Sequence, residues 1–166
     1  MKSITEMSVD SRVAICLAYA ERTLDYLEGE FRDGKYDQAF EKFRMILRMG
    51  HQWLAESHVD WDEVYRMCND DEEEYGCFVF IANAEVTERY ETPSILLIWS
   101  IYYFMYQCAH RSNERYFPQD LWDGSLPEEE EIEMFNSLHS DAAKYLSPEA
   151  CEDLRFIEMK YRSSNI

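Results

Sequence analysis

Apolar side chains recur at helical spacing along most of the chain. Between residues 13 and 54 they form two stripes with steps of three and four residues, and charged residues occupy the opposite positions. A stripe with this period covers one face of an amphipathic helix. The turn sequence Asp33-Gly34 separates the two stripes. We therefore expect two long helices with these inward-facing residues: Val13, Cys16, Leu17, Ala20, Leu24, Leu27, Tyr36, Ala39, Phe40, Phe43, Leu47, Gly50 and Leu54.

The next two predicted helices are shorter. Asp60 has the residue type of a helix N-cap, and Glu63 three residues later fits the reciprocal partner in a capping box. The helix that follows would carry its apolar residues on one side: Trp61, Val64, Tyr65 and Cys68. Beyond an acidic run, another stripe predicts a fourth helix: Phe78, Ile81, Ala82, Val86 and Tyr90.

The segment from Thr92 to Ala109 contains no charged residue. Thr92 followed by Pro93 predicts a helix start, because proline at the first helical position loses no needed donor. A helix that is apolar on all sides is enclosed by others, so we expect a central helix over residues 93–112 with Trp99 in the core. Its β-branched and aromatic residues would also suit a strand. The run is shorter than the roughly 20 residues that cross a membrane, which favours a buried element of a soluble domain.

The last third of the chain begins with an irregular connection that contains Pro118, Asp123-Gly124 and Pro127. Ser125 and Glu128 then predict a capping box, and two further apolar stripes predict two more helices. With only five glycines and four prolines and no hairpin signal, the chain does not resemble a turn-rich β fold. We expect an all-α fold, a bundle of about seven helices, in one domain over residues 1–166.

The charge of the chain narrows the class of partner. Asp and Glu number 34 against 16 Lys and Arg, which gives a net charge of −18, yet 46% of the residues are apolar. Disordered acidic chains have too few apolar residues to form a core, so here we expect the charged residues to lie on the surface of a folded protein. Such a protein repels nucleic acids and anionic membranes and attracts cationic protein surfaces. We expect a monomer or weak dimer that binds a basic protein, with no direct contact to nucleic acid or membrane.

Motifs for catalysis or metal binding are absent from the sequence. The four histidines belong to no HExxH or Glu-x-x-His pattern, and the five cysteines show no zinc spacing. There is no GxSxG motif and no glycine-rich phosphate loop. An odd number of scattered cysteines without a secretory signal indicates reduced thiols in the cytoplasm. We expect no catalytic residue, no metal and no cofactor.

Two acidic runs and two tryptophans remain as candidates for partner binding. The runs, residues 70–74 and 128–131, stand at predicted helix starts, where acidic residues are also common on solvated surfaces. Trp61 and Trp122 lie beside carboxylates, as interface anchors often do, although partial burial also explains them. The candidate partner-binding residues are Asp60, Trp61, Asp62, Asp70, Asp71, Glu72, Glu73, Glu74, Asp120, Trp122, Asp123, Glu128 and Glu129.

Several stretches carry a resemblance to a known family. They are His51-Gln52-Trp53-Leu54, residues 61–65, the apolar run from Trp99 to Ala109, and residues 116–121. With these stretches the chain resembles the small, acidic, all-helical immunity proteins of bacterial polymorphic-toxin systems, in particular the family catalogued as immunity protein six. The resemblance implies a cytoplasmic, non-enzymatic protein that binds a cognate toxin domain and blocks it.

The leading hypothesis is therefore an inhibitor that occludes the basic active site of a nucleic-acid-targeting toxin. A helical adaptor or secretion-type chaperone that holds a partner segment in an apolar groove is the alternative. An enzyme with a hidden site and a mimic of DNA also remain open. Strong salt dependence of binding would favour the acidic inhibitor over the adaptor.

Overall fold

The computed structural model of the protein describes residues 7–56, 58–69 and 77–113, together with scattered positions between 133 and 159. The elements of this described part are all helices, and none is a strand. In chain order they are α1 (Val9–Glu30), α2 (Asp37–Glu56), α3 (Trp61–Asn69), α4 (Cys77–Ala82) and α5 (Ala84–Arg111). The all-α prediction is confirmed here, whereas the helices expected after residue 113 lie largely outside the described residues and the total of about seven stays a prediction.

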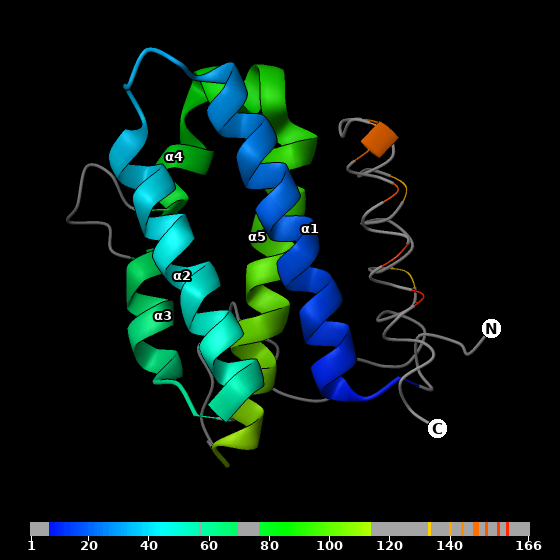
Figure 1. Ribbon diagram of the computed structural model, residues 1–166. Helices are drawn as coiled ribbons and strands as arrows, with labels where there is room; N and C mark the ends of the chain where they lie inside the picture. The colour runs from blue at the N-terminus through cyan, green and yellow to red at the C-terminus, as the bar shows by residue number, and fades with distance from the viewer. Residues whose placement is uncertain are drawn as a thin grey trace.

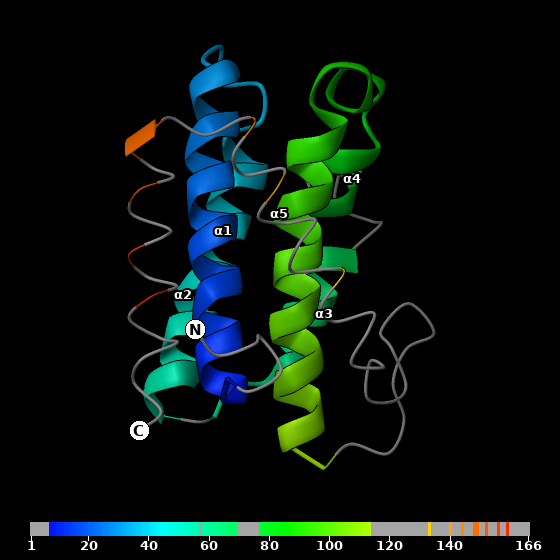
Figure 2. The same cartoon turned by 90° about the vertical axis from the view of Figure 1, so that its right-hand side faces the viewer.

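Three long helices form the frame of the fold (Figure 1). α1 and α2 form an antiparallel hairpin closed by residues 31–36, and α5 runs antiparallel to α1 (Figures 1 and 2). α1 makes its most extensive contacts with α5, while the short α3 and α4 pack against both α2 and α5. The hairpin turn and the connection between α2 and α3 consequently lie at opposite ends of the bundle (Figure 1).

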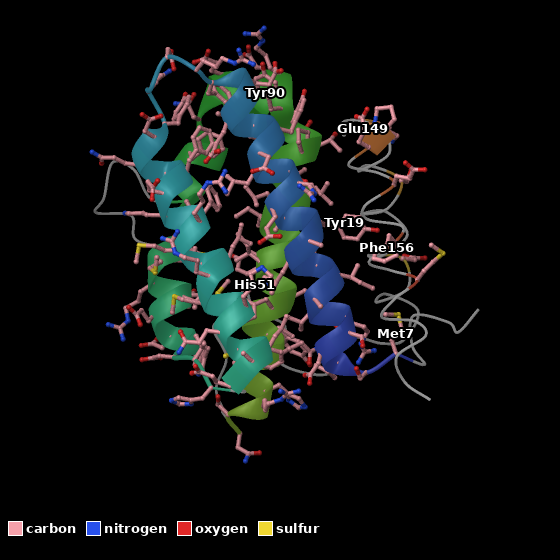
Figure 3. The ribbon with its side chains drawn as sticks, in the orientation of Figure 1. Met7, Tyr19, His51, Tyr90, Glu149 and Phe156 are labelled. Atoms are coloured by element: carbon pink, nitrogen blue, oxygen red, sulfur yellow. The ribbon has the colours of Figure 1, made fainter. Side chains whose placement is uncertain are left out.

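α1 is enclosed on every side over part of its length. Residues 13–20 are all buried, and because eight residues span more than two helical turns, every face of α1 is covered there. Tyr19, which points to the side of α1 away from α2 (Figure 3), is only 1% exposed. The sequence predicted a helix with one apolar face, so its inward-facing residues are confirmed but its degree of enclosure was underestimated.

α1 and α2 approach each other closely at Gly50. A Cβ atom added to Gly50 would lie 2.5 Å from Cδ2 of Leu17, which is fully buried. Any larger residue would therefore force the side chain of Leu17 to shift within a packed core. The glycine at this position of the apolar stripe is explained by the closeness of the two helices.

The predicted boundaries around α5 need correction. The fourth predicted helix is divided at Asn83, whose side-chain oxygen accepts a hydrogen bond from the backbone N–H of Glu85 at 3.0 Å and so starts a new helix. α5 consists of two helical segments that meet at a kink at Tyr90, whose φ of −132° and ψ of 26° are not helical. Pro93 lies in the first turn of the second segment, where a proline loses no needed donor. The helix start predicted at Thr92-Pro93 is therefore close to the start of this second segment, although α5 as a whole begins at Ala84.

The central apolar segment is helical, so the strand alternative is wrong. Residues 103–109 are all buried, as expected for a helix enclosed by others, but the first turns of the segment are not covered on every side. Ile95 and Trp99 are 43% and 40% exposed, and their spacing of four residues places them on one face of α5. The expectation that Trp99 lies in the core is therefore wrong. A fully apolar segment carries no signal that distinguishes the face left to solvent, because that choice depends on which neighbours pack against it.

Trp53 is part of the core. It is 1% exposed, its ring meets that of Phe104 edge-on with centroids 6.1 Å apart, and the guanidinium of Arg111 lies 4.2 Å from its centroid. Arg111 also pairs with Asp10, which joins the end of α5 to the start of α1. These contacts tie α2, α5 and α1 together at one end of the bundle.

The described cysteines are buried free thiols: Cys16, Cys68, Cys77 and Cys108. The structural interpretation of these four is confirmed, and Cys151 lies outside the described residues. Burial raises the pKa of the Cys108 thiol to about 11, so it stays protonated and unreactive at neutral pH. Among the helices that the structure describes, none is long and apolar enough to span a membrane.

Candidate functional site

Three of the predicted partner-binding residues lie together at the start of α3: Asp60, Trp61 and Asp62. The other ten lie outside the described residues, so their position relative to α3 stays a prediction: Asp70, Asp71, Glu72, Glu73, Glu74, Asp120, Trp122, Asp123, Glu128 and Glu129. The described part of the candidate site is thus one helix start with an aromatic residue between two acids.

The carboxylate of Asp60 is occupied in capping α3. Its Oδ1 accepts hydrogen bonds from the backbone N–H groups of Asp62 at 3.1 Å and Glu63 at 3.3 Å. The predicted N-cap is therefore confirmed, and it satisfies donors that the first helical turn leaves unpaired. Asp62 is bonded to the guanidinium of Arg66 one turn later, which raises the pKa of Arg66 further. Glu63 contributes its backbone N–H to the cap, and the residue is exposed.

Trp61 is half-buried and packs against the edge of the core. Its ring meets that of Tyr65 edge-on, with centroids 6.4 Å apart. The preceding Val59 is buried, and its carbonyl oxygen accepts a hydrogen bond from the Cys108 thiol at 3.4 Å. The segment before α3 is thereby fixed to α5, so the exposed part of Trp61 is presented from a rigid support. A rigid, half-exposed aromatic residue is suited to anchoring a partner.

Ion pairs between α1 and α2 were not anticipated from the sequence. Arg44 donates to Oε1 of Glu28 at 2.9 Å and to Oδ1 of Asp25 at 3.0 Å. Nε2 of His51 lies 2.7 Å from Oε1 of Glu21, and His51 faces α1 from α2 (Figure 3). The sequence does place charged residues opposite the two apolar stripes, where ion pairs between the helices can form. Which of these charges meet depends on how the two helices are aligned. These pairs neutralise part of the acidic surface.

The exposed face of α5 is the second feature that sequence reasoning missed. Ile95 and Trp99 present apolar surface to solvent, so no other helix fully covers this side of α5. Trp99 also forms an interaction within the protein, so its ring is held and not free. Within the described residues, no group of three or more potential metal ligands comes together.

Comparison with known proteins identifies a family. The chain matches the family described as Immunity protein Imm6 over residues 11–143, which is well over half of its length. No curated protein and no solved structure matches it. The stretches 51–54 and 61–65, on which the resemblance to immunity proteins was noted, lie inside the matched range. The chain therefore belongs to the Imm6 family of immunity proteins, which are non-enzymatic inhibitors of toxins.

Proposed function

We propose that the protein neutralises a toxin that acts on nucleic acids, by covering the basic groove in which that toxin binds its substrate. The observation that carries this proposal is a net charge of −18 on a folded helical member of an immunity family. An enzyme that binds nucleic acid needs a cationic surface for the phosphates. An acidic protein is attracted to that surface at long range and competes with the substrate for it.

The start of α3 is the proposed centre of contact. Trp61 supplies the apolar anchor, and the neighbouring Asp62 and Glu63 supply carboxylates for charge-assisted hydrogen bonds to lysine or arginine of the toxin. The acidic runs at residues 70–74 and 128–131 extend this surface in the proposal. The neutralising complex forms in the cytoplasm, between one copy of each protein.

A second mode of binding is favoured by one observation. Ile95 and Trp99 expose apolar side chains on one face of α5, as expected for a helical adaptor that holds an apolar partner segment. Binding through this face would depend little on salt, because burial of apolar surface involves no screened charges. Salt dependence of the association rate therefore separates the two modes.

The test uses the cognate toxin domain and a matched pair of charge variants. Asp62→Asn with Glu63→Gln removes two charges at the start of α3, and Glu88→Gln with Glu91→Gln removes two from exposed positions of α5. We expect the first pair to raise the Kd for the toxin about tenfold or more, and the second to change mainly the association rate at low salt. Stopped-flow association and calorimetry measure both quantities.

Two results would overturn parts of this proposal. If the two pairs of substitutions raise the Kd equally, the negative charge promotes binding from the whole surface and the start of α3 is not a specific binding site. The second result has two parts: the association rate is the same at low and high salt, and binding is lost in Trp99→Ala but not in Trp61→Ala. This result would mean that the toxin binds to the apolar face of α5 and not to the acidic site. Survival of toxin-expressing cells with each variant provides the functional readout.

A further inference from the structure

An open pocket of about 550 Å³ lies at the end of the bundle where α1 turns into α2 (Figure 1). Its lining combines the last turn of α1, the turn itself and the first turns of α2: Glu28, Phe31, Arg32, Gly34, Asp37, Phe40 and Glu41. This end of the bundle lies opposite the start of α3 (Figure 1). A volume of this order lies within the range of pockets that hold small ligands and is large enough for one long side chain of a partner.

The apolar part of the pocket is rigid. Phe31 and Phe40 are 8% and 3% exposed, with ring centroids 6.3 Å apart. Phe31 also packs edge-on against Tyr90 at 4.9 Å, and Phe40 against Phe80 at 5.2 Å. Because each ring is held by others of the cluster, the pocket is formed without a ligand. Tyr90, whose backbone distortion was described above, is at this end of the molecule (Figure 3).

The carboxylates of the pocket differ in whether they are already paired within the protein. Glu28 is bonded to Arg44, and Arg32 donates through Nε to the carbonyl oxygen of Gly29 at 2.8 Å. Asp37 and Glu41 are exposed, and neither has an ion-pair partner in the part of the chain that the structure describes. The guanidinium of Arg32 keeps its positive charge because its described acceptor is a neutral carbonyl, so the lining holds one cation against three carboxylates and is negative on balance.

Gly34 keeps the approach to Asp37 open. Its φ is +78°, a conformation that favours glycine. A Cβ atom at this position would lie 3.3 Å from Oδ2 of Asp37, so any other residue would crowd the carboxylate. The turn thus leaves one face of Asp37 accessible from the pocket.

These features define the chemistry of the ligand. A lysine or arginine side chain has a long apolar stem that packs on phenylalanine rings and a charged head that pairs with carboxylates. A metal ion would instead need three or more oxygen, nitrogen or sulphur ligands around one point, and the described residues provide no such group. The aromatic floor likewise suits an organic cation better than a hydrated ion.

We infer that this pocket receives a lysine or arginine side chain of the cognate toxin and forms a second contact, separate from the start of α3. The inference rests on the proposed function for the identity of the partner. Asp37 and Glu41 pair with the charged head, while the stem packs on the small edges of Phe31 and Phe40 that remain exposed. A toxin bound at both ends of the bundle would be held along the length of the protein.

The first experiment needs no toxin. Isotope-labelled protein is titrated with N-acetyl-arginine amide and N-acetyl-lysine amide, with N-acetyl-norleucine amide as the uncharged control, and amide resonances are followed by NMR. We expect the resonances of residues 31–41 to shift with the cationic compounds, and to shift several-fold less in Asp37→Asn with Glu41→Gln. Shifts spread evenly over all exposed acidic residues, or equal shifts with norleucine, would overturn the inference.

The second experiment measures toxin binding by the same double variant. We expect the Kd to rise about tenfold, because charge-assisted hydrogen bonds are lost, while Glu88→Gln with Glu91→Gln changes it far less. If the unchanged protein binds the toxin and the pocket variant binds equally well, the inference fails and the proposed function stands. If the unchanged protein does not bind a basic toxin, the proposed function fails, and the amide titration still decides whether the pocket binds cations.

Discussion

The two ends of the bundle use their acidic residues differently. At the α2–α3 end (residues 53–66), Asp60 caps a helix and Asp62 pairs with Arg66. At the α1–α2 end (residues 28–41), Asp37 and Glu41 line a pocket without a described ion-pair partner. A partner that pairs with Asp62 would have to replace a bond within the protein, whereas a partner that pairs with Asp37 or Glu41 would replace none of the described ion pairs. Net charge alone does not distinguish these roles.

The largest expected effect is a loss of stability, and it distinguishes a core tryptophan from a surface tryptophan at the α2–α3 end. Trp53→Ala removes a buried ring between α2 and α5 and should lower the free energy of unfolding by about 3–5 kcal/mol. Trp61→Ala, at a half-buried position, should cost about 1 kcal/mol. Urea denaturation measures both. Equal losses would mean that Trp61 is a core residue and not a presented anchor.

A smaller effect compares the carboxylates of the two ends. Asp60→Ala removes the acceptor of two backbone N–H groups and should destabilise the protein by about 1 kcal/mol. Asp37→Asn removes only a favourable interaction with the dipole of α2, worth about 0.3–1 kcal/mol before screening. Thermal unfolding at high salt sharpens the contrast, because the dipole contribution is screened and the cap is largely retained. A larger loss for Asp37 at high salt would contradict this division of roles.

The smallest effect concerns His51, between the two ends. Its hydrogen bond with Glu21 raises the pKa of His51 above 6.5, against the opposing effect of burial. The stabilisation is therefore fully present below about pH 6.5 and is lost as the pH rises through the folded-state pKa. Both side chains are about half exposed, so His51→Gln should cost only a few tenths of a kcal/mol at about pH 6 and nothing at about pH 9.

The control for His51 is His58→Gln, an exposed histidine that has no described ion-pair partner. Denaturation curves of both variants at the two pH values give the comparison. A cost of His51→Gln that grew with pH would contradict the assigned direction of the pKa shift.

Local patterns predicted the elements of the fold well because their causes are local. The apolar stripes placed α1 and α2, and the residue type at position 60 predicted the cap of α3. The break at Asn83 was missed because the apolar stripe continues across it. Of the candidate site, only the grouping of Asp60, Trp61 and Asp62 could be predicted, since these residues are neighbours in the chain.

The sequence by itself determined the helical class, the membership of an immunity family and the negative charge, because periodicity, motif and composition require no knowledge of how helices meet. Only the tertiary structure decided which face of α5 is exposed, which carboxylates are paired and where a pocket forms. Each of these depends on contacts between residues far apart in the chain, as in the pairing of Arg44 with Glu28 and the close approach of Gly50 to Leu17. Such contacts follow from the alignment of whole helices, which no short stretch of sequence specifies.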